Sequence, residues 1–446
     1  MGPLNNPKAI ADELAILNHP LTAEERPAIV ELVGQLHAAD GIEDYFDLHV
    51  KLLARYLSRQ RLRGELEADR IAVRDRIREL VAETPKPLGA IRDQQDLLDR
   101  LDRLTRVHVA LGAHTRAIAD GLVWKALRYD RAAITILGDG TRVDRLADDG
   151  IGLQAELDQL DALWEQDHAF TIHNDLATIL RHGDLTTIRP DVGSVEIREV
   201  KATATPGANA PQTIRISTAT TLINQGVVID RETGRTQRLH RLPVQPETFL
   251  PELADVIDES RTDGYADRLV GSMQHVTVID YRAWAGREDE LGKRDSEVTS
   301  QLGWGPEHKT FEWLASYRRM RDRRASFGSL APLAIFPLDP EDIADLILGY
   351  LEVRTLLRGD LLEQAFAAHD ISADVMFGDE TDEVFLRVAR AGVSLAIPPS
   401  LRERLLFELL TPDSAIALAD GMLDLLAADQ LAEDVLPATD ESGIWA

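Results

Sequence analysis

The chain has 446 residues, of which 44% are hydrophobic and 28% are charged. At about 150 residues per domain, this length allows two or three domains, and the composition excludes a collagen-like or wholly disordered chain. Acidic residues outnumber basic ones by 76 to 49, giving a net charge of −27, so the average surface repels nucleic acid and anionic membranes.

Cysteine is absent, which excludes disulfides, thiolate zinc sites and cysteine nucleophiles. No uninterrupted apolar run reaches the length of a membrane span, and the first residues lack the apolar core of a signal peptide. We therefore expect a cytoplasmic protein that does not contact membranes. Of the 49 basic residues only seven are lysines, so the position of each lysine is informative.

Residues 1–127 are predicted to form a helical region, because apolar residues recur at spacings of three and four. The long stretch Ile42–Ala82 is rich in arginine and glutamate and favours a helical hairpin or short coiled coil. Helices of this kind make a protein partner or a homodimer plausible.

Residues 128–290 are expected to form a mixed α/β domain. The alternation in Ala132–Leu137 predicts a strand, and the polar stretch Arg287–Glu307 predicts a connector. Residues 291–446 are expected to form an α/β C-terminal domain.

This C-terminal domain should begin with a helix after Thr310 that carries Arg318 and Arg319. The later elements are predicted as helices at Glu341–Arg358 and Leu361–Ala368, strands at Val384–Val388 and Val393–Ile397, and helices at Leu401–Leu410 and Ser414–Leu426.

The most informative segment is His182–Ala202, which reads as a β-hairpin around the turn residues 190–193. If these four residues form the loop, Arg189 lies opposite Ser194, and Asp184 lies opposite Glu199. Because side chains alternate along a strand, Asp184, Glu199 and Lys201 share one face. Two opposed carboxylates destabilise a strand pair unless something compensates their charge.

A divalent cation would resolve this repulsion. The carboxylates of Asp184 and Glu199, with the backbone carbonyl of Val200, supply hard oxygen ligands suited to Mg²⁺ or Mn²⁺. Lys201 could then orient or deprotonate an attacking water. The competing interpretation is an edge hairpin in which Lys201 forms an ordinary surface salt bridge.

Asp184 followed by Glu199-Val200-Lys201 resembles the core of the PD-(D/E)XK, or restriction-endonuclease-like, phosphodiesterases. The resemblance covers about residues 153–228. It implies a mixed-sheet core within residues 128–290, with Asp184 and Glu199 holding the metal and Lys201 acting at the water. The literal Pro190-Asp191 dipeptide falls in the turn, away from Glu199.

Further site residues are expected on the neighbouring helices. An apolar stripe through Leu176 predicts a helix before the hairpin, on which Glu165 is the first candidate for another metal ligand and Asp175 the second. Alternatively, Glu165 precedes that helix. After the hairpin, a helix from Pro211 to Gly226 would place Gln212 and Arg215 near the Lys201 end, where they could contact a phosphate.

Arg318 and Arg319 belong to the densest basic run and could contact a nucleic-acid backbone, or could pair with acidic residues on the surface. The expected function is a metal-dependent endonuclease, with DNA favoured as the substrate. A role in bacterial antiviral defence, gated by a partner, would suit the acidic surface. The alternative is a noncatalytic interaction protein with a structural or decayed nuclease-like hairpin.

Overall fold

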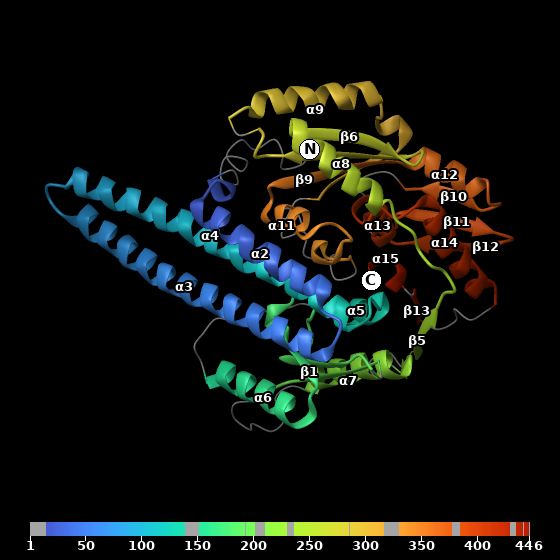
Figure 1. Ribbon diagram of the computed structural model, residues 1–446, viewed down its shortest axis with the longest axis horizontal. Coiled ribbons are helices and arrows are strands. Elements are labelled where there is room, and N and C mark those ends of the chain that lie inside the picture. The colour runs from blue at the N-terminus through green and yellow to red at the C-terminus, as the bar shows by residue number, and fades with distance from the viewer. Residues whose placement is uncertain are drawn as a thin grey trace.

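The computed structural model describes residues 15–138, 151–191, 193–200, 210–229, 236–284, 286–315, 330–376, 384–428, 434–439 and 441–445. These residues form a mixed α/β fold in which long helices lead into small sheets (Figure 1). None of the helices in these ranges combines the length and the hydrophobicity that crossing a bilayer requires.

The predicted helical region is confirmed from residue 15 onward. Its helices are α2 (Pro20–Ala38), α3 (Ile42–Ala82) and α4 (Leu88–Ala126), and α3 and α4 form a long antiparallel hairpin whose tip projects from the body (Figure 1). Between Tyr56 and Val107 the buried apolar side chains are Val73 and Leu80, so the distal half of the hairpin is a largely solvated arm.

The base of this hairpin lies in the core. The second half of α4 is buried almost continuously, with Trp124 fully covered. The next element is the helix α5 (Arg131–Gly138), so the strand predicted at Ala132–Leu137 is wrong. A short apolar run is compatible with either a strand or a buried helix, and here nearly the whole segment is buried.

The hairpin segment lies in a three-stranded antiparallel sheet below the base of α3 and α4 (Figure 1). Its elements are, in chain order, α6 (Ile151–Asp167), β1 (Phe170–His173), the 3₁₀ turn η2 (Asn174–Leu176), β2 (Leu185–Arg189), β3 (Ser194–Arg198) and α7 (Ala210–Gln225).

The helix predicted through Leu176 is wrong, because residues 170–173 form strand β1. All four residues of β1 are buried, so its apolar pattern does not separate one face from the other and fits a helix equally well. The helix predicted from Pro211 is confirmed as α7, which ends before Gly226.

A second small sheet has the order β13-β5-β4 and joins β4 (Val227–Ile229) and β5 (Thr236–Arg241) to β13 (Asp434–Ala438). A four-stranded sheet has the order β6-β7-β9-β8 and comprises β6 (Tyr265–Val270), β7 (Gln274–Asp280), β9 (Leu351–Arg358) and β8 (Thr310–Ala315). Both sheets therefore take strands from either side of residue 290.

The helices around the four-stranded sheet are α8 (Leu250–Asp263), α9 (Glu288–Leu302) and α11 (Pro340–Leu348), with short 3₁₀ turns η3 (Pro306–His308) and η5 (Leu333–Ile335). Three predictions fail here. The segment interpreted as a connector contains α9, and the helix predicted over Glu341–Arg358 stops at Gly349, whose left-handed backbone ends α11 before β9. Residues 310–315 form β8 instead of a helix.

The remaining C-terminal elements are α12 (Gly359–Ala367), β10 (Ser372–Val375), β11 (Leu386–Arg390), β12 (Val393–Ile397), α13 (Pro399–Phe407), α14 (Pro412–Ala427) and α15 (Ser442–Trp445), with β10, β11 and β12 in one antiparallel sheet. Among them, α12, β11, β12, α13 and α14 agree with the prediction, whereas β10 and α15 were not predicted.

A buried ion-pair network joins these C-terminal elements to α5. Arg131 donates to both carboxylate oxygens of Glu408 at 3.0 and 2.8 Å and to those of Glu441 at 2.8 and 2.6 Å. Arg404 contacts the same two glutamates. This balanced set of two cations and two anions links α5 to the C-terminal part of the chain.

Candidate functional site

The hairpin register predicted from the sequence is confirmed over five residue pairs. Strands β2 and β3 pair from Arg189 with Ser194 to Leu185 with Arg198. Along β3, Val195 and Ile197 are buried whereas Glu196 is exposed. The alternation therefore directs Glu199, the next residue after Arg198, to the buried side of the sheet.

Asp184 lies one residue beyond the last pair, where the ends of all three strands meet. Its backbone N–H donates to Arg198 O at 2.8 Å, and its carbonyl accepts from Asn174 N–H at 2.9 Å. Its carboxylate Oδ2 accepts a hydrogen bond from Val200 N–H at 2.7 Å. The structure thus brings the carboxylate of Asp184 to the backbone that directly follows Glu199.

The approach of these strand ends depends on Gly183. This glycine has φ of +67°, and a Cβ at this position would lie 2.6 Å from Arg198 O. Any side chain would therefore collide with the backbone that pairs with Asp184.

Glu199 and Val200 are half-buried and directly follow β3. Lys201, the predicted catalytic lysine, lies outside the described residues, as do Arg318 and Arg319. Within the part of the chain that the structure describes, no three His, Cys, Asp or Glu side chains gather as a metal-binding group. A cation held by Asp184 and Glu199 would therefore need the Val200 carbonyl, other oxygen donors or water.

The two candidates for an additional acidic ligand lie on different elements. Glu165 is exposed in the last turn of α6, ahead of the segment that was predicted as a helix. Asp175 lies in the turn η2. The buried His173 is hydrogen-bonded through Nε2 to Glu156 of α6 at 2.7 Å, as expected for a core histidine.

Helix α7 packs against β3 at the turn end of the hairpin. The Asn224 side chain accepts from Val195 N–H and donates to Val195 O, both at 2.8 Å. Gln212 lies in the first turn of α7, and Arg215 is exposed about one turn later. From Arg215 to Asn224 the helix rises about 14 Å.

Two buried side chains from the helical hairpin support this sheet. His49 of α3 accepts at Nε2 from the backbone N–H of His173 at 3.2 Å. Asp120 of α4 accepts from the backbone N–H groups of Thr178 and Ile179 at 2.5 and 3.3 Å, and from the Thr178 hydroxyl. The loop that leads from β1 to Asp184 is therefore attached to the base of the arm.

Burial changes the pKa values of both supporting groups. It lowers the pKa of His49 to about 3, with a smaller contribution from nearby His173. It raises the pKa of the Asp120 carboxyl, although the hydrogen bonds from Thr178 act in the opposite direction.

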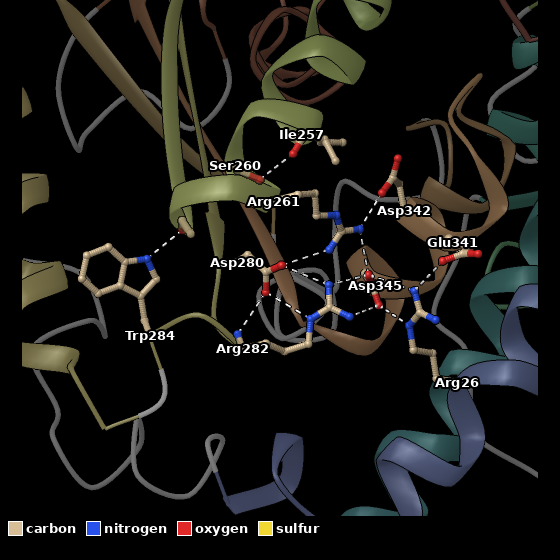
Figure 2. Close-up of polar contacts among 11 residues, drawn as sticks. Arg26, Ile257, Ser260, Arg261, Asp280, Arg282, Trp284, Glu341, Asp342 and Asp345 are labelled. Carbon is tan, nitrogen blue, oxygen red and sulfur yellow. Dashed lines mark hydrogen bonds and ion pairs between the residues drawn. The ribbon is translucent and has the colours of Figure 1, made fainter.

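A second charged cluster connects α2 to the four-stranded sheet (Figure 2). The carboxylate of Asp345 on α11 has no solvent exposure, and it contacts Arg26 at 2.7 Å, Arg261 at 2.8 Å and Arg282 at 2.8 Å. Arg261 also pairs with Asp342 at 2.5 Å, and both Arg261 and Arg282 pair with Asp280. We call these six residues the Asp345 network.

An open depression of about 630 Å³ lies beside the Asp345 network. Burial would raise the pKa of Asp280, but the hydrogen bonds and charge of Arg282, with help from Arg261, hold it below its ordinary value. Burial raises the pKa of Asp342, a change that Arg261 opposes. Each guanidinium already faces carboxylates, so the arrangement is suited to joining α2, α8 and α11.

The sequence analysis missed the Asp345 network because its members are separated by up to 319 residues and form no local motif. One signal was present in α11, where Asp345 interrupts the apolar run Ile343–Leu348. An acid at such a position must be paired with a cation from elsewhere in the fold.

Comparison of the chain with protein-family models, with curated proteins and with solved structures gives no match.

Proposed function

We propose that this protein is a metal-dependent nuclease that hydrolyses phosphodiester bonds, with DNA as the favoured substrate. The observation that carries the proposal is the hydrogen bond from Val200 N–H to the Asp184 carboxylate, at the open end of a hairpin whose five residue pairs have the register that the sequence predicts. Elements α6 and α7 flank this sheet in the chain, as the resemblance to PD-(D/E)XK enzymes leads us to expect.

The donor set fits a hard divalent cation. Asp184 and Glu199 supply carboxylate oxygens and Val200 supplies a carbonyl oxygen, the ligand types that Mg²⁺ and Mn²⁺ prefer. When bound, such an ion would polarise the phosphodiester and lower the pKa of water. Lys201, which follows Val200 in the sequence, is proposed to orient the attacking water and offset the charge that develops on phosphorus.

The substrate would approach over the first turns of α7. The strand advances about 13 Å from Val195 to Glu199. This length is close to the rise of α7 from Asn224, which contacts Val195, back to Arg215. This match supports the placement of Arg215, and of Gln212 before it, near the acidic end of the hairpin. There, they would contact the phosphate backbone. Arg318 and Arg319 remain proposed backbone contacts.

The charge of −27 predicts weak intrinsic affinity for DNA. Activity is therefore expected to depend on low salt, on the metal or on a recruiting partner, which would suit a defence nuclease that is switched on by a signal. The noncatalytic alternative is favoured by the arm of α3 and α4, where Ile71, Val81 and Leu88 are 52%, 42% and 73% exposed. Such a surface could bind a protein partner.

The test is cleavage of plasmid and oligonucleotide DNA with Mg²⁺ or Mn²⁺. We expect Asp184→Ala and Lys201→Ala to abolish cleavage, while Asp191→Ala in the hairpin turn, the matched control, retains it. Cleavage that survives both of the first two substitutions would contradict the assignment. No cleavage under any condition, together with no metal-dependent rise in Tm, would favour the interaction protein.

A further inference from the structure

Asn174, the first residue after β1, carries an unexplained buried acceptor. The residue is 2% exposed, and its side-chain oxygen Oδ1 has no hydrogen-bond partner within the part of the chain that the structure describes. A buried polar atom without a partner costs free energy, because the bond to water that it had in the unfolded chain is not replaced.

The orientation of the Asn174 amide follows from its other contact. The atom 2.6 Å from the carbonyl oxygen of His182 is assigned as Nδ2. A carbonyl oxygen can only accept, so the amide nitrogen must face it, and rotating the amide by 180° would put two oxygens in contact. The bond to His182 therefore leaves Oδ1 as the atom without a partner.

Asn174 is also adjacent to the proposed metal ligand Asp184. Strands β1 and β2 pair in register up to His173 with Leu185, and the next bond, from Asn174 N–H to Asp184 O at 2.9 Å, continues the same register by one residue. Both residues lie just beyond the paired strands, Asn174 at the start of η2 and Asp184 in the bend before β2. The unpartnered oxygen thus belongs to the residue that this backbone bond holds beside Asp184.

We propose that Asn174 is an additional ligand of this site, with Oδ1 binding the divalent cation beside Asp184. Side-chain amide oxygens are ordinary ligands for hard cations and carry no charge, so a third oxygen is added without further repulsion between carboxylates. The cation would supply the partner that Oδ1 lacks. This inference rests on the proposed function, because it assumes that Asp184 binds a metal.

The experiment measures metal binding and not catalysis. Thermal unfolding of the full chain is followed during titration with Mn²⁺ and Mg²⁺ for the wild type, Asn174→Ala, Asn174→Asp and Asp184→Asn. The control Asn224→Asp makes the same chemical change on α7, next to the turn end of β3. Ligand binding to the folded state raises Tm, and the rise grows with the logarithm of the ligand concentration once that concentration exceeds Kd, so the titration reports the affinity.

We expect Asn174→Ala to weaken metal affinity about tenfold or more. Asn174→Asp should retain or strengthen it, because a carboxylate replaces the amide oxygen. Both variants lose the bond to His182, and Asn174→Asp also places an acceptor against that carbonyl, so a purely structural role predicts at least as large a loss for Asn174→Asp as for Asn174→Ala. Opposite effects on metal affinity would therefore isolate the ligand role, and either variant that folds can be compared with the wild type.

Two different failures can be told apart. If the wild type responds to metal and Asp184→Asn does not, but both Asn174 variants bind as the wild type does, the assignment of Asn174 is overturned and the nuclease proposal stands. If the wild type shows no metal-dependent change in Tm, the proposed function and this inference are overturned together.

Discussion

The Asp345 network and the sheet end at Asp184 hold buried or half-buried carboxylates by different means. Asp345 contacts three guanidinium groups from α2, α8 and the turn after β7. At the sheet end, Asp184 Oδ2 accepts a hydrogen bond from the backbone N–H of Val200 at 2.7 Å. The comparison teaches that acid content alone does not identify a cation site, because the guanidinium groups around Asp345 already compensate the charge of that carboxylate.

The largest effect should come from the Asp345 network. Asp345→Ala removes the buried carboxylate that Arg26, Arg261 and Arg282 share and leaves them only their other acidic partners. Loss of one partner from a buried ion pair costs about 3–5 kcal/mol. Urea unfolding monitored by circular dichroism measures this loss. The control Glu341→Ala removes a carboxylate that pairs with Arg26 at 3.2 Å but is 70% exposed, and should cost at most about 1 kcal/mol.

If the comparison is correct, Asp345→Ala lowers stability without changing the response of the folded protein to Mg²⁺. A loss of the metal response that matches the loss at Asp184→Asn would place the metal site at the Asp345 network and reverse the assignment of the two regions.

Two buried histidines of the helical hairpin, His49 of α3 and His114 of α4, should make stability depend on pH. Burial lowers the pKa of His49 and of His114 to about 3. The unfolded chain binds these protons near pH 6.5 and the folded chain does not. Stability is therefore full above pH 6.5 and falls as the pH decreases toward 3, by on the order of 2 kcal/mol per histidine between pH 7 and 5.

Urea unfolding at pH 7 and pH 5 checks this prediction. His49→Gln and His114→Gln should each reduce the difference in unfolding free energy between the two pH values, whereas His369→Gln, at an exposed position, should leave it unchanged. An unchanged difference in both buried variants would show that other groups control the acid response.

The loop between β1 and Asp184 should be sensitive to Asp120. Asp120→Ala removes an acceptor shared by two backbone N–H groups and a hydroxyl, and leaving such groups unpaired costs about 1–3 kcal/mol. Because this loop leads to Asp184, we also expect metal affinity to fall. Thermal unfolding with and without Mn²⁺ measures both effects.

The matched control for Asp120→Ala is Thr411→Ala, which removes the N-cap of α14, where the hydroxyl accepts from Ser414 N–H at 3.2 Å. It should lower stability by about 1 kcal/mol and leave metal affinity unchanged. Equal effects of the two substitutions on metal affinity would mean that Asp120 acts through global stability alone.

The sequence predicted the parts of this fold that depend on local pattern. The turn residues 190–193 were sufficient to predict the register of β2 and β3, because the length of the turn determines which residues of the two strands pair. The short apolar segments at α5 and β1 were assigned to the wrong class, because burial on all sides removes the period that separates helix from strand.

Within the candidate site, the sequence indicated Asp184 and Glu199 through the hairpin, but it did not single out Asn174. Its burial depends on η2, on the His182 carbonyl and on the support of the loop by Asp120, contacts that arise from three different segments. The residues of the Asp345 network lie still further apart in the sequence, since α2 and α11 come into contact only in the folded chain. Long-range pairing of this kind leaves little signal in one sequence.

The smallest effect should come from the exposed face of the same hairpin. Glu196 lies on β3 between the buried Val195 and Ile197, and its 52% exposed side chain pairs with Arg198 at 2.9 Å. Glu196→Ala should change the unfolding free energy by less than about 1 kcal/mol, because exposed ion pairs contribute little. It should leave DNA cleavage and metal affinity unchanged, although it removes a carboxylate only three residues from Glu199.

Metal titration of Glu196→Ala and Glu199→Ala side by side checks this prediction. If both variants lose metal affinity, the overall negative charge of the hairpin attracts the ion. If only Glu199→Ala loses it, the side of the sheet to which the carboxylate points determines metal binding, as the alternation along β3 predicts.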